Sequence, residues 1–152
     1  MIYRQIGLNT SKLKLIKHSF NSPLEALANT PFDVVSENED LEKYKSDKSL
    51  QFLSGDITPN EDGSYTRNDS NVNSRDLIDI EKTGLTSQEV QDIIQEKLAS
   101  YKYVLYSTIS HKPNNPRLRL VLEPSREIVK DEYEPTIKHI MALIGVNYDT
   151  KS

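Results

Sequence analysis

The chain has 152 residues, of which 36% are hydrophobic, and a formal net charge of −4. This length supports one well-packed core, so we expect a single domain over residues 1–152. No apolar run approaches the roughly 18 residues of a membrane span, and residues 1–15 lack the apolar stretch of a secretory signal, so we expect a cytoplasmic protein with no membrane partner.

Few residue types are available for catalysis or metal binding. The chain has no cysteine, which excludes disulfides, thiolate nucleophiles and cysteine-based zinc sites within it. Its three histidines, His18, His111 and His139, are too scattered to form a histidine-rich metal site. Any metal bound by this chain must therefore be held by carboxylates.

Charge is unevenly distributed along the chain. Residues 37–62 carry eight acidic residues against three lysines, whereas residues 97–126 carry six basic residues against one glutamate. The second segment predicts a local basic surface of the kind that contacts nucleic acid. Charge alone favours the simpler alternative, in which these side chains are solvated on ordinary surface strands.

The N-terminal part predicts paired strands followed by a short helix. Residues 2–20 show no helical apolar stripe, and the alternation of lysine and leucine over residues 12–15 is typical of a strand. Ser22 is a capping residue, a proline follows it, and Glu25 lies three residues after the cap. This pattern predicts a helix that begins there and ends before Pro31.

A polar region separates this helix from the next apolar segment. Residues 36–73 are rich in turn-forming residues and poor in apolar ones, so we expect a loop-rich region with short extended pieces. The apolar run at residues 76–81 predicts a buried strand. Thr86 and Glu89 form a capping box, and the apolar spacing behind it predicts a helix to about Ser100.

The C-terminal part predicts two further strands and a last helix. Residues 103–109 and 118–122 are strand-like and are joined by a turn-rich segment at residues 111–116. Apolar side chains at helical spacing over residues 133–144 predict a helix, for which Gly145 is a suitable C-terminal cap. The order of elements predicts an α+β fold, with a mixed or antiparallel central sheet and flanking helices.

Asp79 and Glu81 form an acidic pair within the strand predicted at residues 76–81. Side chains alternate along a strand, so these carboxylates would share one face while Ile78 and Ile80 point to the other. We expect the pair to lie on a central strand and to share a divalent cation, because hard oxygen ligands select Mg²⁺ or Mn²⁺. The simpler alternative is a strand end at which Glu81 reaches solvent.

A histidine and two arginines follow the strand at residues 103–109. His111 lies in the turn after that strand, and Arg117 and Arg119 would share one face of the next strand. Arginine offers fixed forks of donors for phosphate oxygens, so this group is suited to a triphosphate. Taken alone, His111 is more often a loop histidine with no special role.

These motifs occur in a definite order. An acid-x-acid strand is followed by a histidine motif at the end of a later strand and then by a third acidic residue. In this order and spacing the sequence resembles the archaeo-eukaryotic primase superfamily, in its phage, plasmid and mobile-island branch. The segments that carry the resemblance are residues 62–68, 71–73, 77–81, 106–111, 116–122 and 145–149, together with Tyr133.

The resemblance implies an RRM-like primase catalytic core that is incomplete at its C-terminus. It implies that Asp79, Glu81 and Asp149 hold Mg²⁺ or Mn²⁺ for nucleotidyl transfer, with Glu81 standing where aspartate is common in the family. Asp149 lies three residues from the end of the chain, whereas relatives continue with further strands. We therefore expect the chain alone to be a weak or inactive enzyme.

The resemblance also implies a substrate class and partners. His111 would contact the phosphates of the incoming nucleotide, with Arg117 and Arg119 as further nucleotide-binding residues. The implied function is that of a DNA primase-like nucleotidyltransferase acting on nucleoside triphosphates and a single-stranded DNA template, with a replicative helicase or another replication protein as a partner. The alternative is a non-catalytic, truncated primase-fold module that binds or regulates a replication protein.

Overall fold

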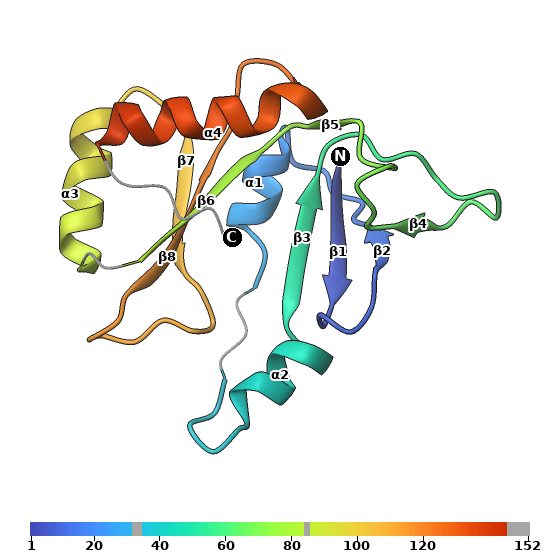
Figure 1. The fold of residues 1–152 in the computed structure, drawn as a ribbon, viewed down its shortest axis with the longest axis horizontal. Coiled ribbons are helices and arrows are strands. Elements are labelled where there is room, and N and C mark those ends of the chain that lie inside the picture. Colours follow the sequence, from blue (N-terminus) through green and yellow to red (C-terminus); the bar gives the residue numbers. More distant parts are fainter. Residues whose placement is uncertain (32–34, 84–85, 146–152) are drawn as a thin grey trace.

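The computed structural model describes residues 1–31, 35–83 and 86–145, with residues 81–83 and Ser87 described by their backbone alone. In these ranges the chain forms a four-stranded sheet, a three-stranded sheet and a two-stranded ribbon, together with four helices (Figure 1). All the strand pairings are antiparallel, so the α+β class is confirmed, although two sheets replace the single central sheet that the sequence predicted. Within the described ranges, no helix is both long and apolar enough to cross a membrane.

The four-stranded sheet is built mainly from the N-terminal residues. Because side chains alternate along a strand, Tyr3 packs into an apolar cluster on one face while its neighbour Arg4 lies on the other face. Arg4 is paired with Phe52 in the register, so these two side chains share that second face. The strands are β1 (Ile2–Ile6), β2 (Lys12–Leu15), β3 (Leu50–Ser54) and β4 (Tyr65–Thr66), in the order β3-β1-β2-β4.

Helix α1 (Pro23–Ala28) lies between the two sheets (Figure 1). It begins as the sequence predicted, because the Ser22 side chain accepts a hydrogen bond from the backbone N–H of Glu25 at 3.2 Å. Its buried Leu24 packs against Leu77 and Val121, which belong to the second half of the chain. This short helix therefore helps to fix one sheet relative to the other.

Helix α2 (Leu41–Asp47) lies inside residues 36–73, where the sequence predicted only loops and short extended pieces, so that part of the prediction was wrong. The helix begins after Asp40, whose carboxylate accepts a hydrogen bond from the backbone N–H of Lys43 at 3.2 Å. None of its side chains is buried, because its seven residues do not form the apolar stripe of a packed helix. The cap was visible in the sequence, but the usual sign of a helix was missing.

The three-stranded sheet carries the predicted acidic pair. Its strands are β6 (Ile78–Thr83), β7 (Tyr103–Ser107) and β8 (Arg117–Leu122), in the order β6-β8-β7. Among the described residues β6 is an edge strand, so the expectation that Asp79 and Glu81 lie on a central strand was wrong. The centre belongs to β8, because β8 follows β7 in a hairpin and also pairs with β6 on its other side.

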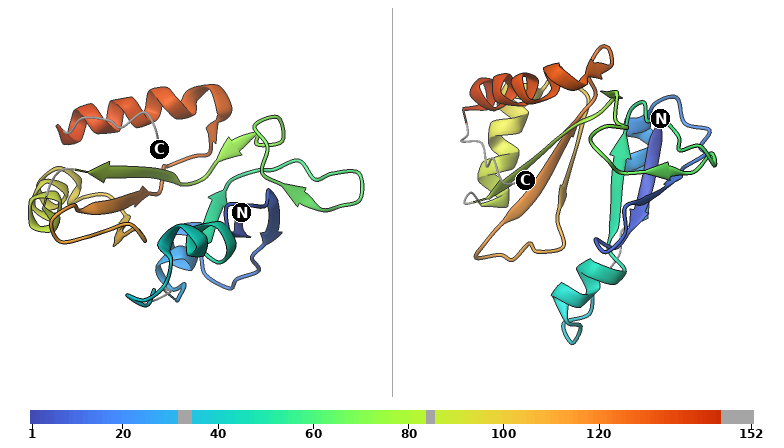
Figure 2. Two further views of the ribbon diagram at one scale, coloured as in Figure 1. Left: turned by 60° about the horizontal axis from the view of Figure 1, so that its bottom comes forward. Right: turned by 45° about the vertical axis from the view of Figure 1, so that its right-hand side comes forward.

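Two helices cover one face of this sheet (Figures 1 and 2). Helix α3 (Ser87–Leu98) begins with the predicted capping box, and helix α4 (Lys130–Ile144) ends at Gly145, whose φ is +77°. Strands β5 (Ser74–Arg75) and β9 (Ile128–Val129) pair to form the two-stranded ribbon. In the chain, β5 comes directly before β6 and β9 comes directly before α4. The buried core between sheet and helices consists of Ile78, Ile80, Val90, Ile94, Leu98, Leu118, Leu120, Leu122, Ile128, Ile137, Met141 and Ile144.

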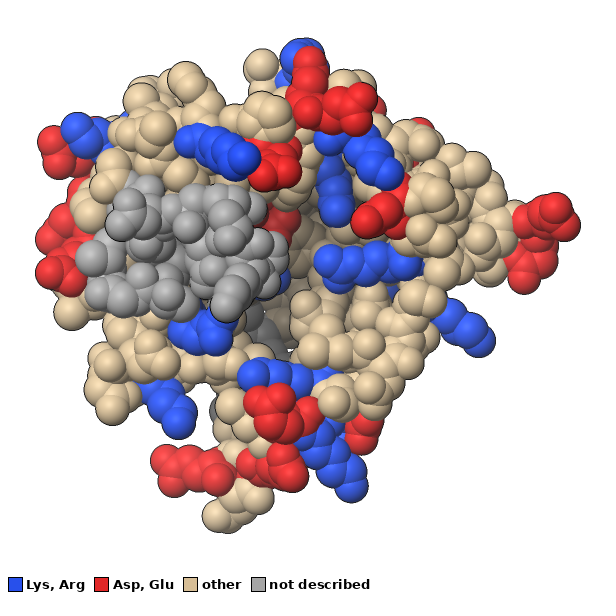
Figure 3. Space-filling model, in the orientation of Figure 1, with Lys and Arg blue, Asp and Glu red and all other residues tan. Residues whose placement is uncertain are grey.

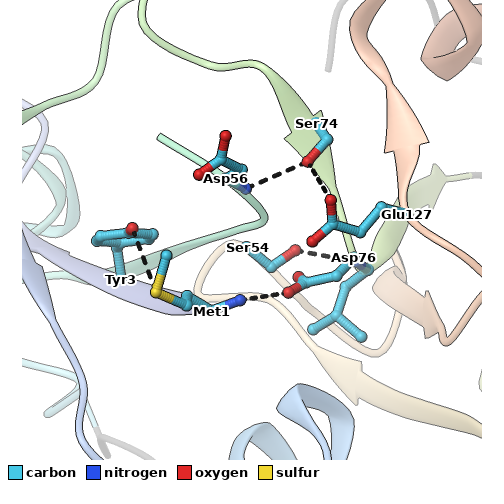
Figure 4. Close-up of polar contacts among 8 residues, drawn as sticks. Met1, Tyr3, Ser54, Asp56, Ser74, Asp76 and Glu127 are labelled. Carbon is cyan, nitrogen blue, oxygen red and sulfur yellow. Dashed lines mark hydrogen bonds and ion pairs between the residues drawn. The ribbon is translucent and has the colours of Figure 1, made fainter. Parts of the chain in front are cut away.

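A network of buried and part-buried polar contacts joins the two sheets where β3 approaches β5 and β6 (Figure 4). The backbone N–H of Leu77 donates to the Ser54 hydroxyl at 3.1 Å, and the backbone N–H of Asp56 donates to the Ser74 hydroxyl at 3.3 Å. The Ser74 hydroxyl in turn donates to the Glu127 carboxylate at 2.9 Å. Away from this network the sheets diverge toward α2 (Figure 2).

We predict that Gly55→Ala destabilises the protein by about 3 kcal/mol or more. Gly55 has a φ of +122°, and an added Cβ would lie 1.9 Å from the backbone oxygen of Ser74. The matched control is Gly63→Ala, because Gly63 also has a positive φ, of +79°, but has nothing within 4 Å of the added atom. That control should lose only about 1 kcal/mol in chemical denaturation. Equal losses for the two variants would contradict a tight junction between the sheets.

We also predict that the free energy of unfolding falls as the pH rises above about 10. Burial, helped by the nearby Tyr65 and Asp56, raises the pKa of Tyr3 to about 12. Unfolded tyrosine therefore releases its proton at a lower pH than folded Tyr3, so the stabilisation is complete below pH 10 and is lost as the pH approaches 12. Thermal unfolding between pH 8 and 11 should show a smaller fall for Tyr3→Phe than for the parent. An equal fall in stability for Tyr3→Phe and the parent would show that Tyr3 is not its cause.

Candidate functional site

A cleft of about 640 Å³ lies between the two sheets. One wall comes from β1, β3, α1 and α2, and the other comes from β7, β8 and the segment that joins them. The apolar side chains of Leu27, Phe52 and Val104 belong both to this lining and to the apolar cluster that joins the sheets. The cleft therefore continues directly from the contact between the sheets.

Four cationic side chains are among the described residues that line this cleft. They are Arg4, Lys45, Arg117 and Arg119, and they come from β1, α2 and β8. No Asp or Glu lies among the described lining residues. Figure 3 shows both blue and red side chains around the hollow between the two halves of the molecule. The described part of the lining is therefore cationic, which suits an anionic ligand.

The arginines of β8 reach the cleft because side chains alternate along that strand. Leu118 and Leu120 are buried in the core beneath the helices, so Arg117 and Arg119 lie on the opposite face, as the sequence predicted. Both arginines also interact with other parts of the protein.

His111 lies beside the cleft in the segment that joins β7 to β8. It is half-buried, and its neighbour Ser110 lines the cleft. Its Nδ1 accepts a hydrogen bond from the backbone N–H of Arg117 at 3.1 Å. Neutral His111 therefore carries its proton on Nε2, and that nitrogen is the donor it would offer to a ligand.

Asp79 is held in place by a tyrosine from α4. The Tyr133 hydroxyl donates to Oδ1 of Asp79 at 2.8 Å and accepts a hydrogen bond from the Asp79 backbone N–H at 3.4 Å. Burial and the negative charge of Asp79 raise the pKa of Tyr133 well above its usual value, so the hydroxyl stays protonated and remains a donor. The second oxygen of Asp79, Oδ2, has no hydrogen-bond partner in the described part of the chain.

The structure tests the rest of the predicted metal site only in part. Glu81 lies two residues after Asp79 in β6 and faces Arg119 in the register of the sheet, so the backbone puts both acids on the face opposite the helices. Nothing is described of the Glu81 side chain, and Asp149 lies outside the described residues. Among the described side chains, no group of three or more His, Asp or Glu comes together to hold a metal.

Sequence reasoning missed the cleft residues of the N-terminal wall. Arg4 and Lys45 carried no motif, and Lys45 lies in α2, where no helix was expected. The ammonium of Lys45 contacts the exposed carboxylate of Glu42 at 3.1 Å. The pairing of β1 with β3, and the packing of Phe52 of β3 against β7 and β8, put Arg4 in the same cleft as Arg117 and Arg119.

The fold and the cleft together define an α+β domain with a cationic cleft between two antiparallel sheets. The model of the VapE N-terminal domain family matches residues 25–152, so the chain belongs to this family. It is a domain associated with the replication of phages, plasmids and other mobile elements. No curated protein and no solved structure gives a significant match.

We predict that Tyr133→Phe lowers the free energy of unfolding by about 1–3 kcal/mol at neutral pH. The substitution removes the hydroxyl that contacts Asp79 but keeps the ring, over which the Arg75 guanidinium lies at 5.2 Å. The matched control is Tyr101→Phe, because Tyr101 is exposed. Urea denaturation of both variants would measure the difference. If both variants match the parent, Tyr133 does not hold Asp79 in place.

Proposed function

We propose that the chain is a primase-type nucleotide-binding domain, which receives the phosphates of a nucleoside triphosphate in the cleft and holds Mg²⁺ or Mn²⁺ at Asp79 and Glu81. One observation carries the proposal: β6, which contains Asp79 and Glu81, pairs directly with β8, and Arg119 of the cleft lining is the register partner of Glu81. Acidic metal ligands next to cationic phosphate ligands are what nucleotidyl transfer requires.

The order of elements supports the proposal. The second half of the chain runs β6-α3-β7-β8-α4, apart from the short β9, with the strand order β6-β8-β7 and both long helices on one face. These are the first five elements of the β-α-β-β-α-β motif of RRM-like domains. The sixth element of that motif would pair with the free edge of β6.

The donor chemistry also agrees with a hard divalent cation. Carboxylate oxygens are the ligands that Mg²⁺ and Mn²⁺ prefer, and Oδ2 of Asp79 is available while Tyr133 holds Oδ1. Asp79 and Glu81 would hold the metal, with Asp149 as a third ligand. When bound, the cation would supply charge neutralisation for phosphoryl chemistry.

The chain's own residues would position the phosphates. Arg117 and Arg119 would offer guanidinium forks to the phosphate oxygens, and His111 would donate from Nε2. In this reading the domain acts in the cytoplasm on a single-stranded DNA template, as part of mobile-element replication and beside a helicase or another replication protein. The non-catalytic alternative keeps the same cleft but needs no metal at Asp79.

The proposal predicts that Asp79→Asn weakens Mn²⁺ binding in the presence of ATP by about tenfold or more. The change removes the negative charge while leaving an oxygen that can accept from Tyr133. Asp131→Asn, in the exposed first turn of α4, is the matched control and should bind like the parent. Titrations followed by electron paramagnetic resonance of free Mn²⁺ would measure both. Equal binding by a folded Asp79→Asn variant would favour the non-catalytic module.

A further inference from the structure

We propose that one face of the four-stranded sheet binds single-stranded nucleic acid, with cations on its phosphates and apolar side chains on its bases. This inference rests on the proposed function, in which the domain acts on a single-stranded template, and it gives that template a surface outside the metal site. We call this surface the basic sheet face. Its residues are Arg4 and Ile6 of β1, Lys12 and Lys14 of β2, and Leu50 and Phe52 of β3.

The register of the sheet puts these side chains on one face. Strands β2, β1 and β3 lie side by side (Figure 1), and Arg4 pairs with Lys14 on one side and with Phe52 on the other. Ile6 lies two residues after Arg4 and pairs with Leu50, so alternation brings this pair to the same face. Cations and apolar side chains are therefore direct neighbours across the three strands.

The lysines of β2 supply the charge at the open side of this face. Lys12 and Lys14 are exposed, and Leu13 between them is buried in the core of the other face. Strand geometry separates the two lysines by about 7 Å, which suits a ligand whose charges repeat along an extended backbone. Strands β1, β2 and β3 contain no Asp or Glu. Nearby, hydrogen bonds from Ser64 are the main cause of the lowered pKa of Asp62, and the charge of Lys12 contributes least.

Apolar side chains lie exposed beside these cations. Ile6 is 50% exposed, and its register partner Leu50 is 40% exposed. Leu8, which follows β1, is 56% exposed and lines the cleft together with Leu50. Adjacent apolar side chains with this exposure mark a binding surface. Phe52 is half-buried and continues the apolar surface into the cleft, where an aromatic ring is suited to stacking with an unpaired base.

This combination favours a single strand as the ligand. A single strand offers phosphates and unstacked bases together, whereas a duplex keeps its bases stacked inside and would leave the exposed apolar side chains without a contact. An acidic peptide is the alternative, but it brings no planar base to Phe52. Arg4, Leu50 and Phe52 belong both to the basic sheet face and to the cleft lining. A strand bound on this face would therefore lead into the cleft.

The test is fluorescence anisotropy of a labelled 12-nucleotide oligothymidylate, titrated with the 152-residue chain and its variants at several salt concentrations. The double variant Lys12→Gln with Lys14→Gln should bind about tenfold more weakly or worse. Its plot of log affinity against log salt should be shallower by about 1.4, because each phosphate contact on a single strand contributes about 0.7. The matched control, Lys97→Gln with Lys138→Gln, removes two exposed lysines from α3 and α4 and should behave like the parent.

A second variant tests the contact with the bases. Ile6→Ser should weaken binding about threefold or more without a change in the salt dependence, because it removes apolar contact but no charge. The matched control is Leu143→Ser in α4, where the parent side chain is 48% exposed. Thermal unfolding checks that each variant folds, and Ile6→Ala serves if Ile6→Ser does not.

The outcomes separate the claims. Losses confined to the lysine double variant and the Ile6 variant support the inference. Parent-like affinity of either folded variant, losses equal to those of the controls, or no binding of oligothymidylate by the parent overturns it. Binding of a 12-base-pair duplex as tightly as the single strand also overturns it, and so does equally tight binding of hexaglutamate, which would indicate an acidic protein partner.

Binding of ATP with Mn²⁺, measured in parallel, reports on the proposed function by itself, because neither lysine of β2 is among the described residues that line the cleft. The lysine double variant should bind ATP with Mn²⁺ like the parent. Failure of the oligothymidylate test with ATP binding intact rejects this inference alone. Absence of ATP binding by the parent, with the expected oligothymidylate results, rejects the nucleotide site and leaves the strand-binding face standing.

Discussion

The structure depends on one constraint, which is the close contact of its two sheets around Leu77, Val121 and Gly55. There Leu77 and Val121 pack with Leu24 and with Phe52 of β3, and Gly55 brings its backbone against that of Ser74. Close packing at this region holds the sheets together, while their divergence toward α2 leaves the cleft between them (Figure 2). The cleft is thus a direct result of how and where the sheets meet.

Because side chains alternate along a strand, one face of the second sheet packs in the core and the opposite face is left for the cleft. In β8 the leucines at positions 118 and 120 are buried under α3 and α4, and the arginines at positions 117 and 119 line the cleft. A slip of one residue in the register would exchange these roles and bury the charges. In β6 the buried Ile78 and Ile80 likewise pack in this core, and the strand pairs with β8 so that Asp79 is the register partner of Val121.

Local patterns in the sequence predicted several elements correctly. The caps at Ser22 and Thr86 marked two helices correctly, and alternation placed Arg117 and Arg119 on one face. Helix α2 was missed because it buries no side chain and has no apolar stripe. The edge position of β6 and the cleft role of Arg4 were also missed, because both depend on pairing between strands far apart in the chain, which no local pattern encodes.

The central claim is that the cleft between the two sheets binds a phosphate-bearing ligand. Amide hydrogen exchange of the chain with and without ATP and Mn²⁺ tests this claim most directly, because it reports on every segment at once. The account predicts slower exchange in β1 and around β7 and β8 together, with little change in α3, which lies on the far side of the second sheet. Slower exchange on one wall alone, or no change on either wall, would contradict it.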